Sequence, residues 1–311
     1  MCYNILREKV KAGMSESMSE KDIRFDNIVK TLYPPVLYFM ITLFVEVGVD
    51  FYLFFKQAKS VTQSGGSFLS SYRFMDNLQN NLDEYTYLIT FLSALIGLVV
   101  FGILYIRECS LDEKKNIKKG LKFGNGTDFL MVTGLAIFGS TGLGRFVSLL
   151  PLDNIIGNYE ATSSSLLKGG LLLQILSLVI VVPITEALIY RGLVFRRLQK
   201  LMDVKMAMIV VSVIFGVFHF NLLQGVYSFL LSLLLVCVFL KYQSIFVCML
   251  VHSVANAISV LSNYYGISEI FNRSLFVYFL IMIIELAIAL LLFLKIMNAE
   301  MSPENKNENQ N

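Results

Sequence analysis

Long apolar stretches separated by short polar segments dominate this chain. An apolar run of about 18 residues or more can cross the hydrocarbon core of a bilayer as a helix. Backbone hydrogen bonds must be satisfied within lipid, and the alternating pattern of a barrel is not seen, so the fold class predicted is an all-α, polytopic transmembrane helical bundle of about eight spans. The spans predicted by hydropathy are 36–55, 86–106, 129–150, 170–190, 206–220, 222–240, 245–261 and 275–297.

The order of these segments predicts five parts. They are a cytosolic N-terminal tail at 1–33, N-terminal transmembrane helices and loops at 34–165, a core of transmembrane helices at 166–265, a C-terminal transmembrane helix at 266–297 and a disordered tail at 298–311. The first part lacks an apolar core followed by a cleavage site, so no cleavable signal peptide is predicted. The last part is rich in Asn and Glu and cannot bury enough apolar surface to become ordered.

Composition and charge agree with a protein that lies in a membrane. With 56% hydrophobic and 16% charged residues, the chain is too apolar for an ordinary soluble domain. A net charge of +3 gives no reason to expect nucleic-acid binding. The segments 107–122 and 191–205 are rich in Lys and Arg, whereas 151–167 contains neither. Since short cytoplasmic loops retain basic residues, we expect a multi-pass cell-membrane protein with both termini in the cytoplasm and the loop at 56–84 outside.

Several ionisable residues interrupt the predicted spans. Such residues are rare in lipid and usually face the interior of a bundle, so each is a functional candidate. They are Glu46, Asp50, Arg145, Glu186, Arg191, Glu285 and the only two histidines of the chain, His219 and His252. The sequence assigns no role to Glu46, Asp50, Arg145 or Glu285.

Helix geometry allows three of the spans to bring their polar residues together. In a helical hairpin that turns near 201–204, Glu186 and His219 both lie about 21 Å from the turn. His252 lies on the seventh span at a reachable depth, and Asn256 follows at i+4 on the same helix face. We therefore expect these four side chains to converge.

The residues around these positions form three ordered motifs. They are T-E-A-L-I-Y-R-G at 185–192, F-G-V-F-H at 215–219 and H-S-V-A-N at 252–256. This series resembles the signature E-E-x-x-x-R, F-x-x-x-H, H-x-x-x-N of the CPBP intramembrane endopeptidases, the Abi-type family of CAAX proteases and bacteriocin-processing enzymes. The resemblance covers roughly 168–262, and three ordered motifs are together more specific than any one. One position departs from it, because Ala187 replaces the second glutamate.

The resemblance implies an intramembrane endopeptidase whose catalytic core is the segment 166–265, and we expect no cofactor. Its substrates would be hydrophobic or lipid-modified peptides or proteins within membrane lipids, and its roles would include peptide maturation or bacteriocin self-immunity. A buried carboxylate is a suitable base for activating water. The implied residues are Glu186 as the base, His219 to orient the water, His252 and Asn256 to stabilise the oxyanion, and Arg191 and Phe215 as supporting residues.

Because Ala187 replaces a glutamate, the carboxylate partner of Arg191 is missing from this position. In an α-helix, positions 187 and 191 lie one above the other, whereas 186 and 191 lie on different faces. A second glutamate would therefore brace the arginine, and its loss leaves Glu186 competent. One hypothesis is that Glu46 replaces the missing partner.

Other functions fit the same polar residues. One carboxylate and two imidazoles can bind catalytic zinc, so Glu186, His219 and His252 are alternative metal ligands. We favour a metal-free mechanism because no H-E-x-x-H helix is present and Asn256 suits a hydrogen-bond donor. A membrane transporter and a non-cleaving immunity or scaffold protein of the same fold are further alternatives. The sequence predicts no oligomeric state, substrate identity or cleavage site.

Overall fold

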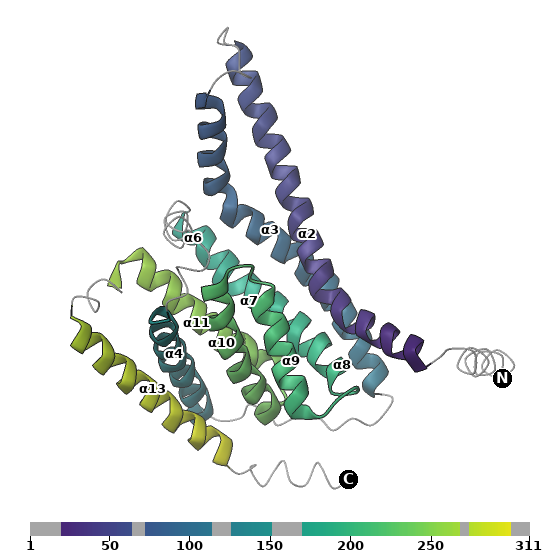
Figure 1. The fold of residues 1–311 in the computed structure, drawn as a ribbon, viewed down its shortest axis with the longest axis vertical. Coiled ribbons are helices and arrows are strands. Elements are labelled where there is room, and N and C mark those ends of the chain that lie inside the picture. The colour runs from purple at the N-terminus through teal and green to yellow at the C-terminus, as the bar shows by residue number, and fades with distance from the viewer. Residues whose placement is uncertain (1–19, 64–71, 114–125, 151–169, 268–273, 300–311) are drawn as a thin grey trace, which may run out of the picture.

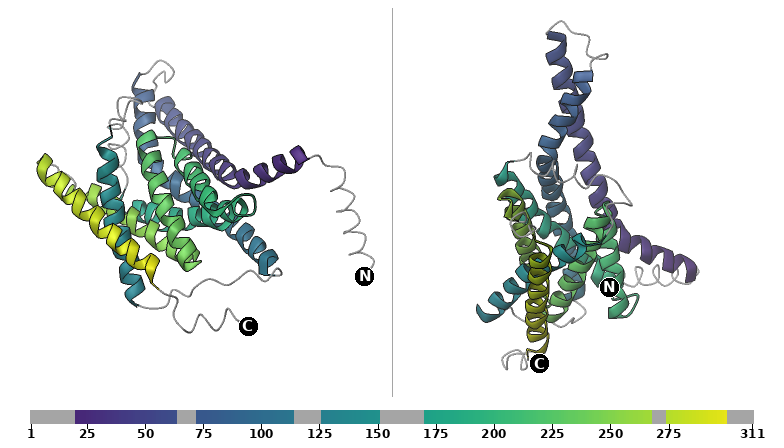
Figure 2. Two further views of the ribbon diagram at one scale, coloured as in Figure 1. Left: turned by 60° about the horizontal axis from the view of Figure 1, so that its bottom comes forward. Right: turned by 60° about the vertical axis from the view of Figure 1, so that its left-hand side comes forward.

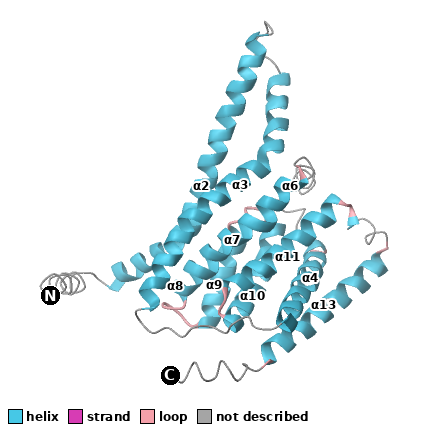
Figure 3. Cartoon of the chain, turned by 180° about the vertical axis from the view of Figure 1, so that it is seen from behind, coloured by secondary structure: helices cyan, strands magenta, loops and turns pink. Residues whose placement is uncertain are grey.

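Helices form all the regular structure of the part of the chain that the computed structural model describes. This part comprises residues 20–63, 72–113, 126–150, 170–267 and 274–299 (Figure 3). The predicted all-α polytopic bundle is confirmed. Seven candidate membrane spans are found in it by length and composition: Asp26–Lys59, Tyr85–Ser110, Gly126–Ser148, Leu171–Leu198, Leu222–Tyr242, Ile245–Tyr264 and Leu275–Asn298. Part of the basic segment 107–122, all of the segment 151–167 and most of both predicted tails lie outside the described residues.

The first two helices form a pair that extends far beyond the other helices. Helix α2 (Glu20–Gln63) packs against α3 (Tyr72–Glu113), and Figures 1 and 2 show the pair projecting from the bundle. The 44 residues of α2 measure about 66 Å, roughly twice the thickness of a bilayer core. Near its N-terminal end α2 bends, where Pro34 and Pro35 interrupt its hydrogen bonds (Figure 1).

The helices of this pair extend beyond the predicted spans at 36–55 and 86–106. Residues 20–33, predicted to be tail, are the first turns of α2. The predicted loop at 56–84 is also largely helical, because α2 continues to Gln63 and α3 begins at Tyr72. Hydropathy marks only the apolar part of a helix, and a polar extension can continue the same helix beyond it.

The fourth predicted span is a continuous but irregular helix in the centre of the bundle. Its segments are α6 (Leu171–Gln174), the π-helix η2 (Ile175–Val181), α7 (Val182–Glu186), the π-helix η3 (Ala187–Phe195) and α8 (Arg196–Leu198). All nine residues of η3 are buried. Single π-helical turns within α-helices are frequent at functional sites, so the polar side chains on this irregular helix are candidates for chemistry.

A tight hairpin follows this span. Helix α9 (Val204–Val217) begins at the cap Asp203, whose carboxylate accepts from the main-chain N–H groups of Lys205 and Met206. Helix α10 (Leu222–Tyr242) packs against α9 at Gly216, where an added Cβ would lie 2.6 Å from the carbonyl oxygen of Gly225. The absence of side chains lets the two helices approach closely. At 14 residues α9 is about 21 Å long, shorter than the seven long spans.

Three more helices complete the bundle. Helix α4 (Gly126–Ser148) packs against α10, α11 (Ile245–Tyr264) and α13 (Leu275–Asn298). Arg145 of α4 forms an ion pair with Glu285 of α13, with 3.0 Å between Nε and Oε2. The Tyr278 hydroxyl of α13 donates to the Arg145 carbonyl at 2.8 Å. These two ionisable residues within the spans therefore join helices.

Candidate active site

Glu186 and His252 face each other in the interior of the bundle. Glu186 ends α7 and His252 lies on α11, and 3.8 Å separates Glu186 Oε2 from His252 Nε2. Their side chains are 14% and 6% exposed, respectively, so little solvent reaches either group. The structure thus brings together a carboxylate and an imidazole that are 66 positions apart in the sequence.

Phe215 connects the two histidines. Its buried ring makes edge-to-face contacts with His219, at 4.9 Å between centroids, and with His252, at 6.0 Å. Tyr190 makes a third edge-to-face contact with the same ring at 4.7 Å. Such contacts restrict the tilt of each ring, so Phe215 helps to orient both imidazoles.

His219 does not lie on a helix, contrary to the prediction of a span at 206–220. Helix α9 ends at Val217, and Phe220 adopts a positive φ of 53° that turns the chain toward α10. The side chain of Asn221 caps α10 by accepting from the main-chain N–H of Gln224 at 3.0 Å. Apolar residues on both sides conceal this turn from hydropathy. The capping pattern N-x-x-Q at 221–224 is the sequence signal that could have located it.

The end of α9 determines which nitrogen of His219 carries its proton. The main-chain N–H of His219 bonds to the Gly216 carbonyl at 3.2 Å rather than to the Phe215 carbonyl of a regular helix. His219 Nδ1 contacts the Phe215 carbonyl oxygen instead, at 2.7 Å. A carbonyl oxygen only accepts, so Nδ1 is the donor and Nε2 of the neutral ring keeps a lone pair.

Asn256 lies one helical turn beyond His252 and contacts the fourth span. Its Nδ2 donates to the Leu178 carbonyl oxygen in η2 at 2.7 Å. A side-chain amide carries two N–H donors, so one remains for another acceptor. Sequence reasoning identified Asn256 but not this main-chain partner.

Arg191 is completely buried and forms no ion pair with the described residues. Its Nη2 donates to Ser232 Oγ of α10 at 3.0 Å, and its guanidinium lies 4.9 Å from the centre of the Phe215 ring. Among the described residues, its Nε and Nη1 atoms find no hydrogen-bond partner. The hypothesis that Glu46 replaces the missing partner is wrong, because Glu46 is exposed and does not pair with Arg191.

The π-helix changes the expected relation of Glu186 to Arg191. In an α-helix positions five apart lie on different faces, but a π-helix closes its turn with i→i+5 hydrogen bonds. Because η3 starts directly after Glu186, the side chains of Glu186 and Arg191 point in more similar directions than an α-helix would allow. Their opposite charges interact, and the charge of Glu186 also acts on the phenol groups of Tyr38 and Tyr190. The sequence analysis missed both tyrosines.

The alternative zinc ligands Glu186, His219 and His252 are not grouped around one point in the described part of the chain. Among the residues that the structure describes, no three His, Cys, Asp or Glu side chains are placed to hold one ion. The Nδ1 atom of His219 is engaged by a carbonyl, which leaves Nε2 as the ring nitrogen with a lone pair.

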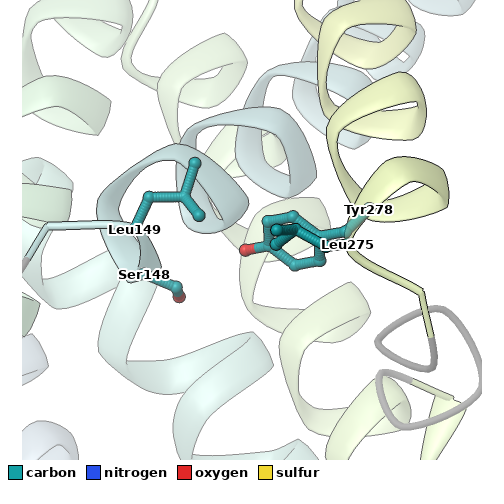
Figure 4. A pocket seen from close by; sticks show the side chains of 4 residues that line it. All are labelled: Ser148, Leu149, Leu275 and Tyr278. Atoms are coloured by element: carbon teal, nitrogen blue, oxygen red, sulfur yellow. The ribbon is translucent and has the colours of Figure 1, made fainter.

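A pocket lies elsewhere, between the end of α4 and the start of α13. Ser148, Leu149, Leu275 and Tyr278 line it, as Figure 4 shows. None of these residues belongs to the three motifs, and the pocket adds no group to the candidate site.

Comparison with known proteins supports the family resemblance. Residues 168–258 match the family model described as type II CAAX prenyl endopeptidase Rce1-like. No curated protein and no solved structure matches the chain. The matched segment includes Glu186, His219, His252 and Asn256, and it supports an intramembrane protease of the CAAX type. The family predicted from the three motifs, that of the CPBP or CAAX-type intramembrane proteases, is thus confirmed for the segment that carries them.

Proposed function

We propose that this protein is an intramembrane endopeptidase in which Glu186 activates water without a metal ion. The observation that carries the proposal is the approach of Glu186 to His252, at 3.8 Å, inside a helical bundle. His219 contacts the same aromatic ring as His252. A buried carboxylate beside two imidazoles supplies the base and the donors that peptide-bond hydrolysis requires.

Glu186 would act first as a base and then as an acid. It takes a proton from water while the water oxygen attacks the substrate carbonyl carbon, and it then gives that proton to the departing nitrogen as the C–N bond breaks. His219 would accept a hydrogen bond from the same water through Nε2, since its Nδ1 is bound to the Phe215 carbonyl. This contact would orient the water.

Two donors would hold the negative oxygen that develops on the substrate. They are a proton on His252 Nε2 and the Asn256 N–H that does not bind Leu178. Fixed donors are most effective in a site with little water, and His252 is buried while Asn256 is half-buried. Arg191 would support Glu186 as a nearby positive charge, and Phe215 would hold both imidazoles in orientation.

The substrates we propose are hydrophobic or lipid-modified peptides and proteins. Glu186 lies near the middle of the candidate span Leu171–Leu198, so a scissile bond must reach it from within the membrane. A segment that is itself apolar can do so at a lower free-energy cost than a polar one.

Comparative proteomics of membrane peptides tests this proposal in cells. Cells with Glu186→Gln should accumulate uncleaved substrates and lose the corresponding products relative to wild type. Glu46→Gln is a matched control, because Glu46 is an exposed glutamate on α2. Identical peptide sets in wild type and Glu186→Gln would contradict the proposal.

Ala187 motivates a second candidate, a non-cleaving immunity or scaffold protein of the same fold. Ala187 is buried directly after Glu186, where the family signature has its second glutamate. Such a protein would keep its protective effect when Glu186, His219 and His252 are all replaced. Loss of the effect in the Glu186→Gln variant alone would favour the protease.

A further inference from the structure

The carbonyl group of Leu178 lies within η2, and its donor in the register of η2 would come from the first turn of α7. Within η2 the hydrogen bonds follow the i→i+5 pattern, and the last of them joins the Val182 N–H to the Ser177 carbonyl. The next bond in that register would run from residue 183 to Leu178. Residue 183 is proline, which has no N–H.

This arrangement leaves the Leu178 carbonyl without its helical donor. The residue four positions later, Val182, cannot supply the bond, because its N–H bonds to Ser177. A carbonyl group without a partner is costly in the interior of a membrane protein. Asn256 of α11 supplies the missing donor through Nδ2 at 2.7 Å.

The contact also fixes the orientation of the Asn256 amide. A carbonyl oxygen cannot donate, so the nitrogen of the amide, and not its oxygen, faces Leu178. With one N–H held, the other N–H and Oδ1 have fixed directions. His252, one turn earlier on α11, is buried beside Glu186 and shares the face of Asn256.

We propose that Pro183 is a positioning residue that frees the Leu178 carbonyl to bind and aim the Asn256 amide. The inference rests on the proposed function in one respect, namely that Asn256 stabilises the oxyanion. The new element is that the orientation of the Asn256 amide depends on Pro183, which lies in another helix. Prolines in transmembrane helices are tolerated where a neighbouring side chain satisfies the free carbonyl, which is the situation at Leu178.

Thermal unfolding of the full-length protein tests the anchor independently of activity. Asn256→Leu removes the donor and should lower the Tm of the wild-type protein. In a Pro183→Ala background the new N–H satisfies the Leu178 carbonyl, so the same replacement should lower the Tm by clearly less. Pro34→Ala is the matched control, since Pro34 also lies inside a helix but on α2. The effects of Pro34→Ala and Asn256→Leu should add. Additive effects of Pro183→Ala and Asn256→Leu would overturn the inference.

Kinetics test whether the anchor aims a catalytic donor. With Pro183→Ala the Asn256 amide shares its acceptor with a helical N–H, and we expect kcat to fall by about tenfold, less than the roughly 10²-fold loss of a whole oxyanion donor. KM should stay within about twofold of wild type, because the donor acts only in the transition state. An unchanged kcat in Pro183→Ala, with activity lost in Asn256→Leu, would overturn the positioning role. If the wild-type protein cleaves nothing, the proposed function fails, and the unfolding measurement alone decides the anchor.

Discussion

Main-chain carbonyl groups hold two of the four proposed catalytic side chains. His219 binds the Phe215 carbonyl at the end of α9, and Asn256 binds the Leu178 carbonyl beside Pro183. Both carbonyls lie where a helix ends or changes its register, and such positions leave acceptors without helical donors. Irregular backbone thus orients the polar side chains of the site.

Ser232 should stabilise the buried guanidinium of Arg191. Its hydroxyl accepts the one hydrogen bond that Arg191 makes, and Ser232→Ala leaves that donor unsatisfied in the interior. We expect the free energy of unfolding to fall by about 1–3 kcal/mol. Denaturation of the purified protein measures this change. Ser228→Ala, at a buried serine one turn earlier on α10, should have a smaller effect. Equal effects at both serines would argue against a specific role for Ser232.

At the residue scale, the motif residues could be predicted but their partners could not. Glu186, His219, His252 and Asn256 follow from ordered motifs and from depth along helices. Their partners, such as Ser232 and Leu178, lie on other helices and follow no local pattern. The Glu46 hypothesis failed because rise along a helix gives the depth of a residue but not the direction that it faces.

The contact between α9 and α10 holds the turn that carries His219. Helices α9 and α10 approach each other closely at Gly216, three residues before His219. Gly216→Ala would place a Cβ 2.6 Å from a main-chain oxygen that cannot move without moving α10. We expect a loss of about 1–3 kcal/mol or more in unfolding free energy, together with reduced activity.

Gly48 provides the control for this replacement. It is an exposed residue in the interior of α2, and an added Cβ there meets nothing within 4 Å. Gly48→Ala should leave stability unchanged or raise it by roughly 0.5–1 kcal/mol. Paired denaturation curves check both variants, and an unchanged stability of Gly216→Ala would refute the close contact.

Most helices could be predicted from hydropathy, but their ends and irregular turns could not. The predicted span at 275–297 corresponds closely to α13, which is strongly apolar throughout. By contrast, the predicted span at 206–220 ran past the end of α9, because the turn that follows is also apolar. The π-helical segments have no simple sequence pattern, although Pro183 marked the place where helical hydrogen bonds must change.

Helices α4 and α13 lie outside the segment that matches the family model, and an ion pair joins them. Arg145 and Glu285 join α4 to α13, with side chains only 16% and 14% exposed. Arg145→Met should lower the unfolding free energy by about 3 kcal/mol, because it leaves a buried carboxylate unpaired. Adding Glu285→Leu should restore most of that loss. Thermal unfolding measures both, and additive losses in the double variant would show that the pair is not coupled.

We propose that both termini face the cytoplasm, as the distribution of basic residues predicts. Arg197, near the end of the candidate span Leu171–Leu198, binds Glu108 of α3, with 2.6 Å between Nη2 and Oε2. A protease-cleavable tag at each terminus should therefore be protected in sealed right-side-out vesicles and cleaved in inverted ones. Cleavage of either tag in right-side-out vesicles would contradict this orientation.

The central claim is that Glu186 activates water for peptide-bond cleavage without a metal. The most direct measurement is cleavage of a lipid-modified peptide by the purified, chelator-treated protein in liposomes. Wild type and Glu186→Gln are compared after their Tm values have been found equal. We predict full activity of the wild type after chelation and a loss of about 10²-fold or more in Glu186→Gln. Activity that disappears on chelation and returns with zinc, or a Glu186→Gln variant as active as wild type, would contradict the claim.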